Sequence, residues 1–223
     1  MNKQQKTIKH NWSPTEEEAK RIQADLRDRV IKGDRFTEVR YVAGVDAGFN
    51  RDDSTTQAAV VVLSFPDLEL VDRASLQVST NFPYIPGFLS FREIPALMQA
   101  IDKLTTMPDL ILCDGQGYAH PRRFGLACHL GVLLDIPTIG VAKTRFIGEH
   151  DEVPPDRGSW QPLRDGGEII GAVLRSQTNV KPLYVSIGHK ISLPTAIDYV
   201  LRCAPRYRLP ETTRLSDRLS KEQ

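Results

Sequence analysis

Hydrophobic residues recur at helical spacing near the N-terminus of the chain. Ser13-Pro14-Thr15-Glu16 has the form of a capping box with proline at the first helical position. Ile22, Leu26 and Val30 then fall on one face of a helix. The pattern predicts a helix that runs to about residue 31 and stops at Gly33.

The pattern then changes to apolar runs of the length of strands. These runs occupy residues 41–46, 58–65 and 68–78, and Pro66-Asp67 supplies the turn between the second and the third. Because the links are short, we expect an antiparallel meander.

Helical and strand patterns alternate in the middle of the chain. Ser90 is placed to cap a helix that continues to Leu104, with Pro95 tolerated in its first turns. Further elements are predicted as strands at 109–114 and 137–142 and a helix at 123–134. This β-α-β-α-β order predicts parallel strands with right-handed crossovers. After a polar loop over 149–160, we expect strands near 168–176 and 182–187 and helices near 193–202 and 211–220.

Three antiparallel strands followed by parallel crossovers predict an α/β protein. Its mixed sheet would be flanked by helices, which is the layout of ribonuclease H-like folds. The chain shows no internal repeat, low-complexity segment or long linker, so one domain over residues 1–223 is expected, with residues 1–12 flexible. A layout of this kind leaves the function open.

Composition excludes few classes of protein. The chain is 40% hydrophobic and 26% charged, as in ordinary soluble proteins. No run approaches the roughly 18 apolar residues of a membrane span, and the first ten residues lack the apolar core of a signal peptide. Three widely spaced cysteines, an odd number within apolar segments, predict buried reduced thiols in a cytoplasmic protein.

The net charge of +1 argues neither for nor against nucleic acid as a partner. Local charge is more informative. Residues 202–223 hold six lysines or arginines against three acids.

Two carboxylates end buried strand patterns. Asp46 follows the apolar run 42–45, and Asp114 ends the run 110–113 and precedes Gly115 and Gly117. An unpaired carboxylate is costly to bury, so each needs a cation, donors or an exit to solvent. If the strands are neighbours, their backbones lie about 5 Å apart, and the converging carboxylates favour a hard cation such as Mg²⁺. Ordinary strand ends in turns are the alternative.

Three other positions carry candidate chemistry with a plain alternative. Glu93 starts a helix, where it would complement the dipole, or it is a third acid beside Asp46 and Asp114. The loop 81–87 sets Tyr84 and Ile85 between prolines, either as a wedge for base steps or as a rigid loop on the core. Lys143 ends a parallel strand, where it would contact phosphate or only solvent. Phosphate-loop, nucleophile-elbow and zinc signatures are absent from the sequence.

Five segments, in order and spacing, resemble the endonuclease V (deoxyinosine 3′ endonuclease) family. They are Val42-Ala43-Gly44-Val45-Asp46; Phe82-Pro83-Tyr84-Ile85-Pro86-Gly87 with Phe91-Arg92-Glu93; Asp114-Gly115-Gln116-Gly117 with His120-Pro121-Arg122-Arg123; Ile136-Pro137-Thr138-Ile139-Gly140-Val141-Ala142-Lys143; and Leu209-Pro210-Glu211-Thr212-Thr213-Arg214. The match spans residues 13–219, nearly the whole chain.

The resemblance implies a ribonuclease H-like fold and a Mg²⁺-dependent DNA-repair endonuclease, with Mn²⁺ as a substitute metal. It implies hydrolysis of the second phosphodiester 3′ to deoxyinosine, which leaves 3′-hydroxyl and 5′-phosphate ends. The implied partner is damaged DNA, single- or double-stranded. The protein is expected to be a monomer that does not associate with a membrane.

The resemblance also assigns residues by position. Asp46, Glu93 and Asp114 match the metal-binding acids, and His120 and Lys143 match further catalytic positions. Tyr84 matches a wedge with Ile85 and Pro86 in its loop, and Gly87, Gly115 and Gly117 match the lining of the lesion pocket. Arg122, Arg123 and Arg145 are candidate phosphate contacts, which would make binding salt-dependent. Some members carry histidine where this chain has Asp217, and both can bind metal directly or through water.

Three other functions remain open at this stage. The chain could be an endoribonuclease acting at inosine in RNA, a non-catalytic reader of deaminated nucleic acid, or an α/β domain with incidental motifs. Cleavage of matched RNA and DNA substrates separates the endoribonuclease from the DNA-repair enzyme. Tight lesion binding without any Mg²⁺ binding would favour the non-catalytic reader.

Overall fold

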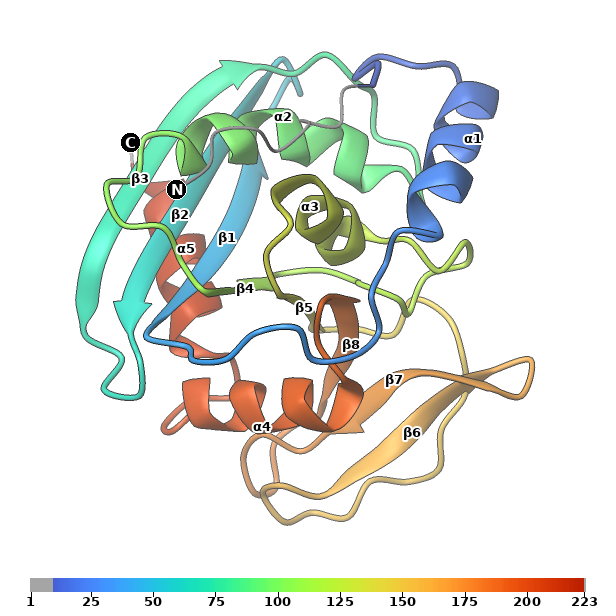
Figure 1. Cartoon of the computed structure of the whole chain (residues 1–223), viewed down its shortest axis with the longest axis vertical. Coiled ribbons are helices and arrows are strands. Elements are labelled where there is room, and N and C mark those ends of the chain that lie inside the picture. The colour runs from blue at the N-terminus through green and yellow to red at the C-terminus, as the bar shows by residue number, and fades with distance from the viewer. Residues whose placement is uncertain (1–9, 223) are drawn as a thin grey trace.

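The computed structural model describes residues 10–222 as one mixed sheet with helices on both faces (Figure 1). Residues 1–9, which include most of the segment expected to be flexible, and residue 223 lie outside the described part. Of the described elements, the helices are α1 Glu16–Arg27, α2 Leu89–Ile101, α3 Leu126–Leu134, α4 Leu193–Cys203 and α5 Glu211–Lys221. The strands are β1 Tyr41–Phe49, β2 Thr55–Ser64, β3 Leu70–Ser79, β4 Leu110–Cys113, β5 Thr138–Ala142, β6 Trp160–Asp165, β7 Glu168–Leu174 and β8 Leu183–His189.

The eight strands lie in the order β3-β2-β1-β4-β5-β8-β7-β6. β1, β4 and β5 are parallel, and the other pairings are antiparallel. This confirms the predicted α/β class, the meander and the parallel crossovers. No helix within residues 10–222 is long and apolar enough to cross a membrane.

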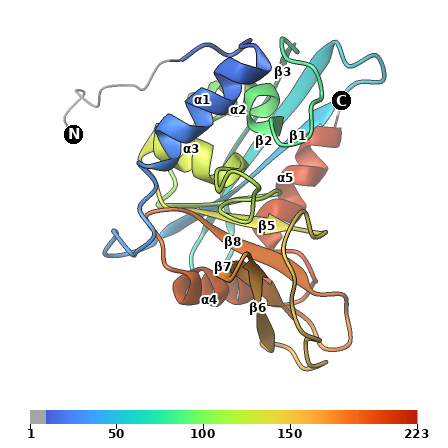
Figure 2. The same ribbon diagram turned by 90° about the vertical axis from the view of Figure 1, so that its right-hand side faces the viewer.

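Alternation along β1 directs successive residues to opposite faces of the sheet. Ala43 and Val45 pack with α2 residues such as Ile94 and Leu97. Gly44 faces α5, because a Cβ at Gly44 would lie only 2.1 Å from the carbonyl oxygen of Thr212. The absent side chain therefore lets α5 lie directly on β1, on the face opposite to α2 (Figure 2).

Several helix boundaries differ from the prediction. α1 is capped by Thr15 rather than Ser13: the Thr15 hydroxyl accepts from the Glu18 N–H at 3.2 Å, and the Ser13 hydroxyl donates instead to the Asn81 carbonyl. The three acids that follow Thr15 then sit in the first turn, where the helix dipole favours them. α1 also ends at Arg27 rather than near residue 31.

α2 and β6 also correct the prediction. Ser90 is not the cap of α2 but lies inside its first turn, where its hydroxyl meets the ring of His129 at 3.0 Å, and α2 ends at Ile101 rather than Leu104. The sequence pattern predicts no strand at β6: the expected loop reaches only to Trp160, and residues 161–165 carry no predicted element. β6 contains Pro162, which lacks an N–H but is tolerated because β6 is an edge strand. Cys113, Cys128 and Cys203 are buried free thiols, as predicted.

Candidate active site

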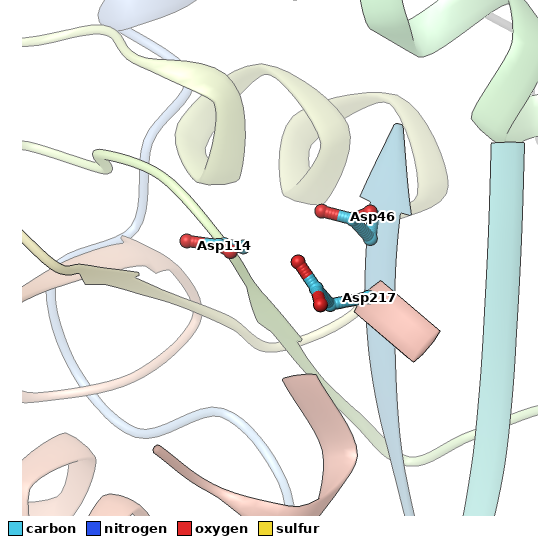
Figure 3. A group of neighbouring side chains, drawn as sticks. All are labelled: Asp46, Asp114 and Asp217. Atoms are coloured by element: carbon cyan, nitrogen blue, oxygen red, sulfur yellow. The ribbon is translucent and has the colours of Figure 1, made fainter. Parts of the chain in front are cut away.

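Three aspartates converge where the carboxyl ends of the central strands meet α5. Asp46 lies in β1, Asp114 directly follows β4, and Asp217 lies in α5. The neighbouring parallel strands bring Val45 level with Cys113, so the next residue of each chain segment reaches the same edge. Among the described residues, these three offer carboxylate oxygens that all lie within 4.8 Å of one another (Figure 3).

The electrostatics of this acid triad favour a cation. Burial raises the pKa of Asp46, and the charges of Asp114 and Asp217 raise it further, although a hydrogen bond from Ser220 acts in the opposite direction. An all-oxygen donor set with mutual repulsion suits a hard divalent ion. The three side chains therefore fit the metal that the sequence predicts.

Lys143, directly after β5, supplies a positive charge to the acid triad. Its ammonium lies 2.6 Å from Asp114 Oδ2 and 3.8 Å from Asp217 Oδ1. Burial alone would lower the pKa of Lys143, but the hydrogen bond to Asp114 and the surrounding carboxylates raise it. Lys143 is thus held charged between two members of the triad.

Glu93 lies behind the triad, in α2. It is 7% exposed, and burial, followed by the charges of Asp46 and Asp114, raises its pKa well above the usual value. The charges of the triad thus act on the Glu93 carboxylate. Among the described residues, however, the carboxylates that converge are those of the three aspartates, not that of Glu93. Its assignment as a metal ligand stays a prediction.

A cavity of ≈ 360 Å³ adjoins Asp114 and Lys143. Tyr84, Ile85, Pro86, Gly87, Gly115 and His120 line it, together with Leu89, Ser90, Leu126, Arg145 and Phe146 among others. Tyr84 is 66% exposed, whereas Phe82 of the same loop is buried in the core. The loop is therefore anchored by one aromatic residue and presents the other.

Two predicted substrate-binding residues do not line this cavity. Gly117 is buried against β8, where a Cβ would lie 2.2 Å from the Ile187 carbonyl oxygen. Arg122 points to the Tyr84 loop: its guanidinium donates to the Gly87 carbonyl at 2.6 Å and covers the Phe88 ring at 4.3 Å. The structure thus gives Gly117 a packing role and gives Arg122 a role in holding the loop.

The candidate phosphate contacts also differ from one another. Arg123 is ion-paired with Asp165 and Glu168, each at 2.8 Å, so its charge is engaged within the protein. Arg145 is exposed and lines the cavity. Of the two, Arg145 is better placed to meet a phosphate group.

The Gly87 carbonyl is the centre of a hydrogen-bond network. It accepts from Gln23 Nε2 at 3.0 Å and from His120 Nε2 at 3.1 Å, in addition to Arg122. His120 Nδ1 accepts from the Arg122 backbone N–H at 3.2 Å. With one nitrogen donating and the other accepting, His120 is neutral. The network fixes Gly87 in its left-handed conformation, with φ of +84°.

His120 should make stability depend on pH. Burial, helped by the nearby charge of Arg122, lowers the pKa of His120 to about 4. In the unfolded chain His120 takes up a proton near pH 6.5, whereas in the folded chain it stays neutral until about pH 4. The stability that comes from burying the neutral ring is therefore lost as the pH falls from 6.5 towards 4. Between pH 6.5 and 4, the unfolding free energy of wild type should therefore fall by up to about 3 kcal/mol more than that of His120→Gln.

Urea unfolding at several pH values measures this difference. His150→Gln, in a loop outside the network, is the matched control. Parallel pH profiles for wild type and His120→Gln would show that His120 is not a buried neutral ring.

Sequence reasoning gave Asp217 only as a doubtful position and missed Ser220, Gln23 and Phe146. For Asp217 and Ser220 the signal was present in the helical spacing, because Thr213, Asp217 and Ser220 share one face of α5. Gln23 and Phe146 gave no such signal, because they reach the site only through tertiary contacts.

Comparisons with known proteins show which family this chain resembles. A family model described as Endonuclease V matches residues 24–218. An endonuclease V of Rippkaea orientalis is 66% identical over 204 residues, which are 92% of this chain and 89% of that protein.

Two solved structures are also similar. The crystal structure of endonuclease V from Streptomyces avermitilis has a TM-score of 0.91 at 45% identity, covering 96% of this chain and 95% of the other. Ciona intestinalis endonuclease V has a TM-score of 0.82 at 30% identity, covering 93% and 97%. The Ciona protein is in complex with a 23mer DNA containing an inosine followed by a ribo-adenosine.

Proposed function

Since the chain belongs to the endonuclease V family, we propose that it is a DNA-repair endonuclease that recognises deaminated bases, chiefly deoxyinosine. It would hydrolyse the second phosphodiester bond 3′ to the lesion and leave 3′-hydroxyl and 5′-phosphate ends. The observation that carries the proposal is the convergence of three carboxylates beside a cavity that an exposed aromatic residue lines.

Asp46 and Asp114 would hold Mg²⁺, or Mn²⁺ in its place. Asp217 converges with them, and Glu93, whose pKa their charges raise, would be the further metal-binding acid. A divalent cation would relieve the repulsion that, after burial, raises the pKa of Asp46. When bound, it would neutralise charge on the phosphate and make water more acidic, both of which favour hydrolysis.

The protein's own cation has a separate task. Lys143 is held by Asp114 and Asp217, so its ammonium lies where a phosphate would approach these acids. Lys143 would orient that phosphate and stabilise the negative charge that develops on it.

The cavity would receive the lesion base after it leaves the stack. Its volume of ≈ 360 Å³ lies within the range of small-molecule sites, about 300–1,000 Å³. Extrusion costs a few kcal/mol and less at a mispaired base, which favours lesions. Tyr84 would fill the vacated space. Hypoxanthine differs from adenine by its O6 acceptor and N1–H donor, so backbone groups at Gly87 and Gly115 would distinguish the two bases.

His120 would act through the Tyr84 loop. Its ring lines the cavity, and its N–H holds the Gly87 carbonyl. The Gly87 carbonyl already accepts three hydrogen bonds, so other backbone atoms at Gly87 would make the contact with the base. We assign His120 to the shaping of the lesion pocket.

The proposal is tested by mapping the cut on a duplex with one deoxyinosine against a matched duplex with deoxyadenosine. We expect one nick, one nucleotide beyond the lesion on its 3′ side. The upstream product should be extended by a polymerase, and the downstream product should be ligated without phosphorylation. Cutting of both duplexes alike, or on the 5′ side, would contradict it.

An endoribonuclease acting at inosine is the second candidate, because the DNA bound to the Ciona relative carries a ribo-adenosine after the inosine. Side-by-side cleavage of inosine-containing RNA and deoxyinosine-containing DNA of one sequence decides between them. Faster cleavage of the DNA supports the repair function, and faster cleavage of the RNA supports the endoribonuclease.

A further inference from the structure

Tyr207 forms an exposed aromatic platform in the loop between α4 and α5. The residue is 51% exposed, and the guanidinium of Arg214 lies over its ring, 4.6 Å from the centroid. Arg214 is itself held by Glu211, which accepts from its Nε at 2.9 Å and from its Nη2 at 2.7 Å. The aromatic ring is therefore supported on one side and accessible to solvent.

The platform adjoins the acid triad through two links. Arg208, the next residue after Tyr207, donates to the carbonyl of Lys143 at 2.8 Å. Arg214 precedes Asp217 by three residues in α5, so the two side chains are neighbours on the helix surface. Tyr207 is thus linked, through Arg208 and Arg214, to Lys143 and Asp217, whose side chains lie 3.8 Å apart at the acid triad.

The platform and the lesion cavity belong to opposite faces of the sheet. Leu89 and Ser90 of α2 and Leu126 of α3 line the cavity. α5 packs on the other face of β1, where Thr212 meets Gly44. Asp114 lines the cavity, whereas Asp46 accepts a hydrogen bond from Ser220 of α5, so the acid triad reaches from the cavity to the α5 face. A strand with its lesion in the cavity and its scissile bond at the acids would therefore continue onto the α5 face.

The chemistry of this surface suits a nucleic-acid strand. Bases of any identity stack on exposed aromatic rings, and arginine adds a cation–π contribution. Arg206, next to Tyr207 in the chain, is exposed and adds positive charge that would attract phosphates. An isolated exposed tyrosine would need no explanation, but this one is braced by arginine next to a catalytic centre.

We infer that Tyr207, supported by Arg214, is a stacking site for a nucleotide 3′ to the cleaved bond. The inference rests on the proposed function, because it assumes that the lesion occupies the cavity 5′ to that bond. It assigns the segment of substrate downstream of the cut to the α5 face.

Binding of two deoxyinosine strands tests the inference. Both share one 5′ flank. The long strand continues well past the cut, and the short strand ends at the nucleotide 5′ to the cleaved bond, so it lacks every nucleotide assigned to the α5 face. Affinity is measured by fluorescence anisotropy in Ca²⁺, so that cleavage is avoided. Tyr207→Ala should weaken binding of the long strand roughly 5- to 150-fold and leave binding of the short strand unchanged.

Two variants control the experiment. Tyr207→Phe keeps the ring and should bind the long strand like wild type. Trp160→Ala removes another exposed aromatic residue, in the edge strand β6, and should change neither affinity. Equal affinities of Tyr207→Ala and wild type for the long strand, or equal losses on both strands, would overturn the stacking site.

Nicking of the long strand in Mg²⁺ separates this inference from the proposed function. Normal nicking by wild type with no effect of Tyr207→Ala on affinity refutes the stacking site alone. Absence of nicking by wild type refutes the proposed function, and with it the assignment of Tyr207 to the downstream strand.

Discussion

Asp114→Asn is expected to lower the rate of nicking at deoxyinosine by at least about 100-fold. Removing a residue that only hydrogen-bonds to a metal ligand typically lowers metal affinity or activity 10- to 100-fold. Removing a residue that would bind the metal itself should lower activity at least as much. Asparagine keeps the size of the side chain but removes the charge that meets Asp46, Asp217 and Lys143. Single-turnover nicking in Mg²⁺ measures the effect.

Affinity for the lesion separates a metal role from a structural role. Because Asp114 lines the cavity but the remainder of the lining is unchanged, the variant should still bind the deoxyinosine duplex. Asp151→Asn, at an exposed loop position, is the matched control and should nick like wild type. Wild-type nicking by Asp114→Asn would mean that the acid triad is not the catalytic centre.

Gly44→Ala is expected to lower the free energy of unfolding by about 3 kcal/mol or more, at the upper end of the usual cost of overpacking. The added methyl group would lie 2.1 Å from the Thr212 carbonyl oxygen and 2.7 Å from the Thr213 nitrogen. These are backbone atoms that cannot rotate away. For a domain of this size the melting temperature should fall by roughly 6–12 °C.

The same substitution should also reduce nicking, since α5 carries Asp217 and Ser220 to Asp46. Gly48→Ala provides the matched control in the same strand, because a Cβ there meets nothing within 4 Å. Thermal melting and nicking of both variants test the account. A Gly44→Ala protein as stable and as active as Gly48→Ala would show that α5 does not rest on β1 as described.

Strands β2 and β4 could be predicted because they are buried on both faces and read as continuous apolar runs, over 58–63 and 110–113. Strand β6 could not, because an edge strand tolerates Pro162 and needs no apolar run. The start of α1 was predicted too early because Ser13 and Thr15 are both residue types that cap helices, and the local sequence does not choose between them.

The candidate site shows the same division. Asp46 and Asp114 could be paired in advance, because adjacent parallel strands end at one edge. The part played by Asp217 depends on the packing of α5 against Gly44, which no local pattern reports. Arg122 has the residue type of a phosphate ligand, but its hydrogen bond to Gly87 places it in the support of a loop.

The most direct test of the account is nicking of a single-deoxyinosine duplex by chelator-treated protein, before and after Mg²⁺ is returned. The account predicts no product without metal, a single 3′-side nick once Mg²⁺ or Mn²⁺ is added, and none on the undamaged duplex under either condition. Nicking at the same rate without a divalent cation would contradict it.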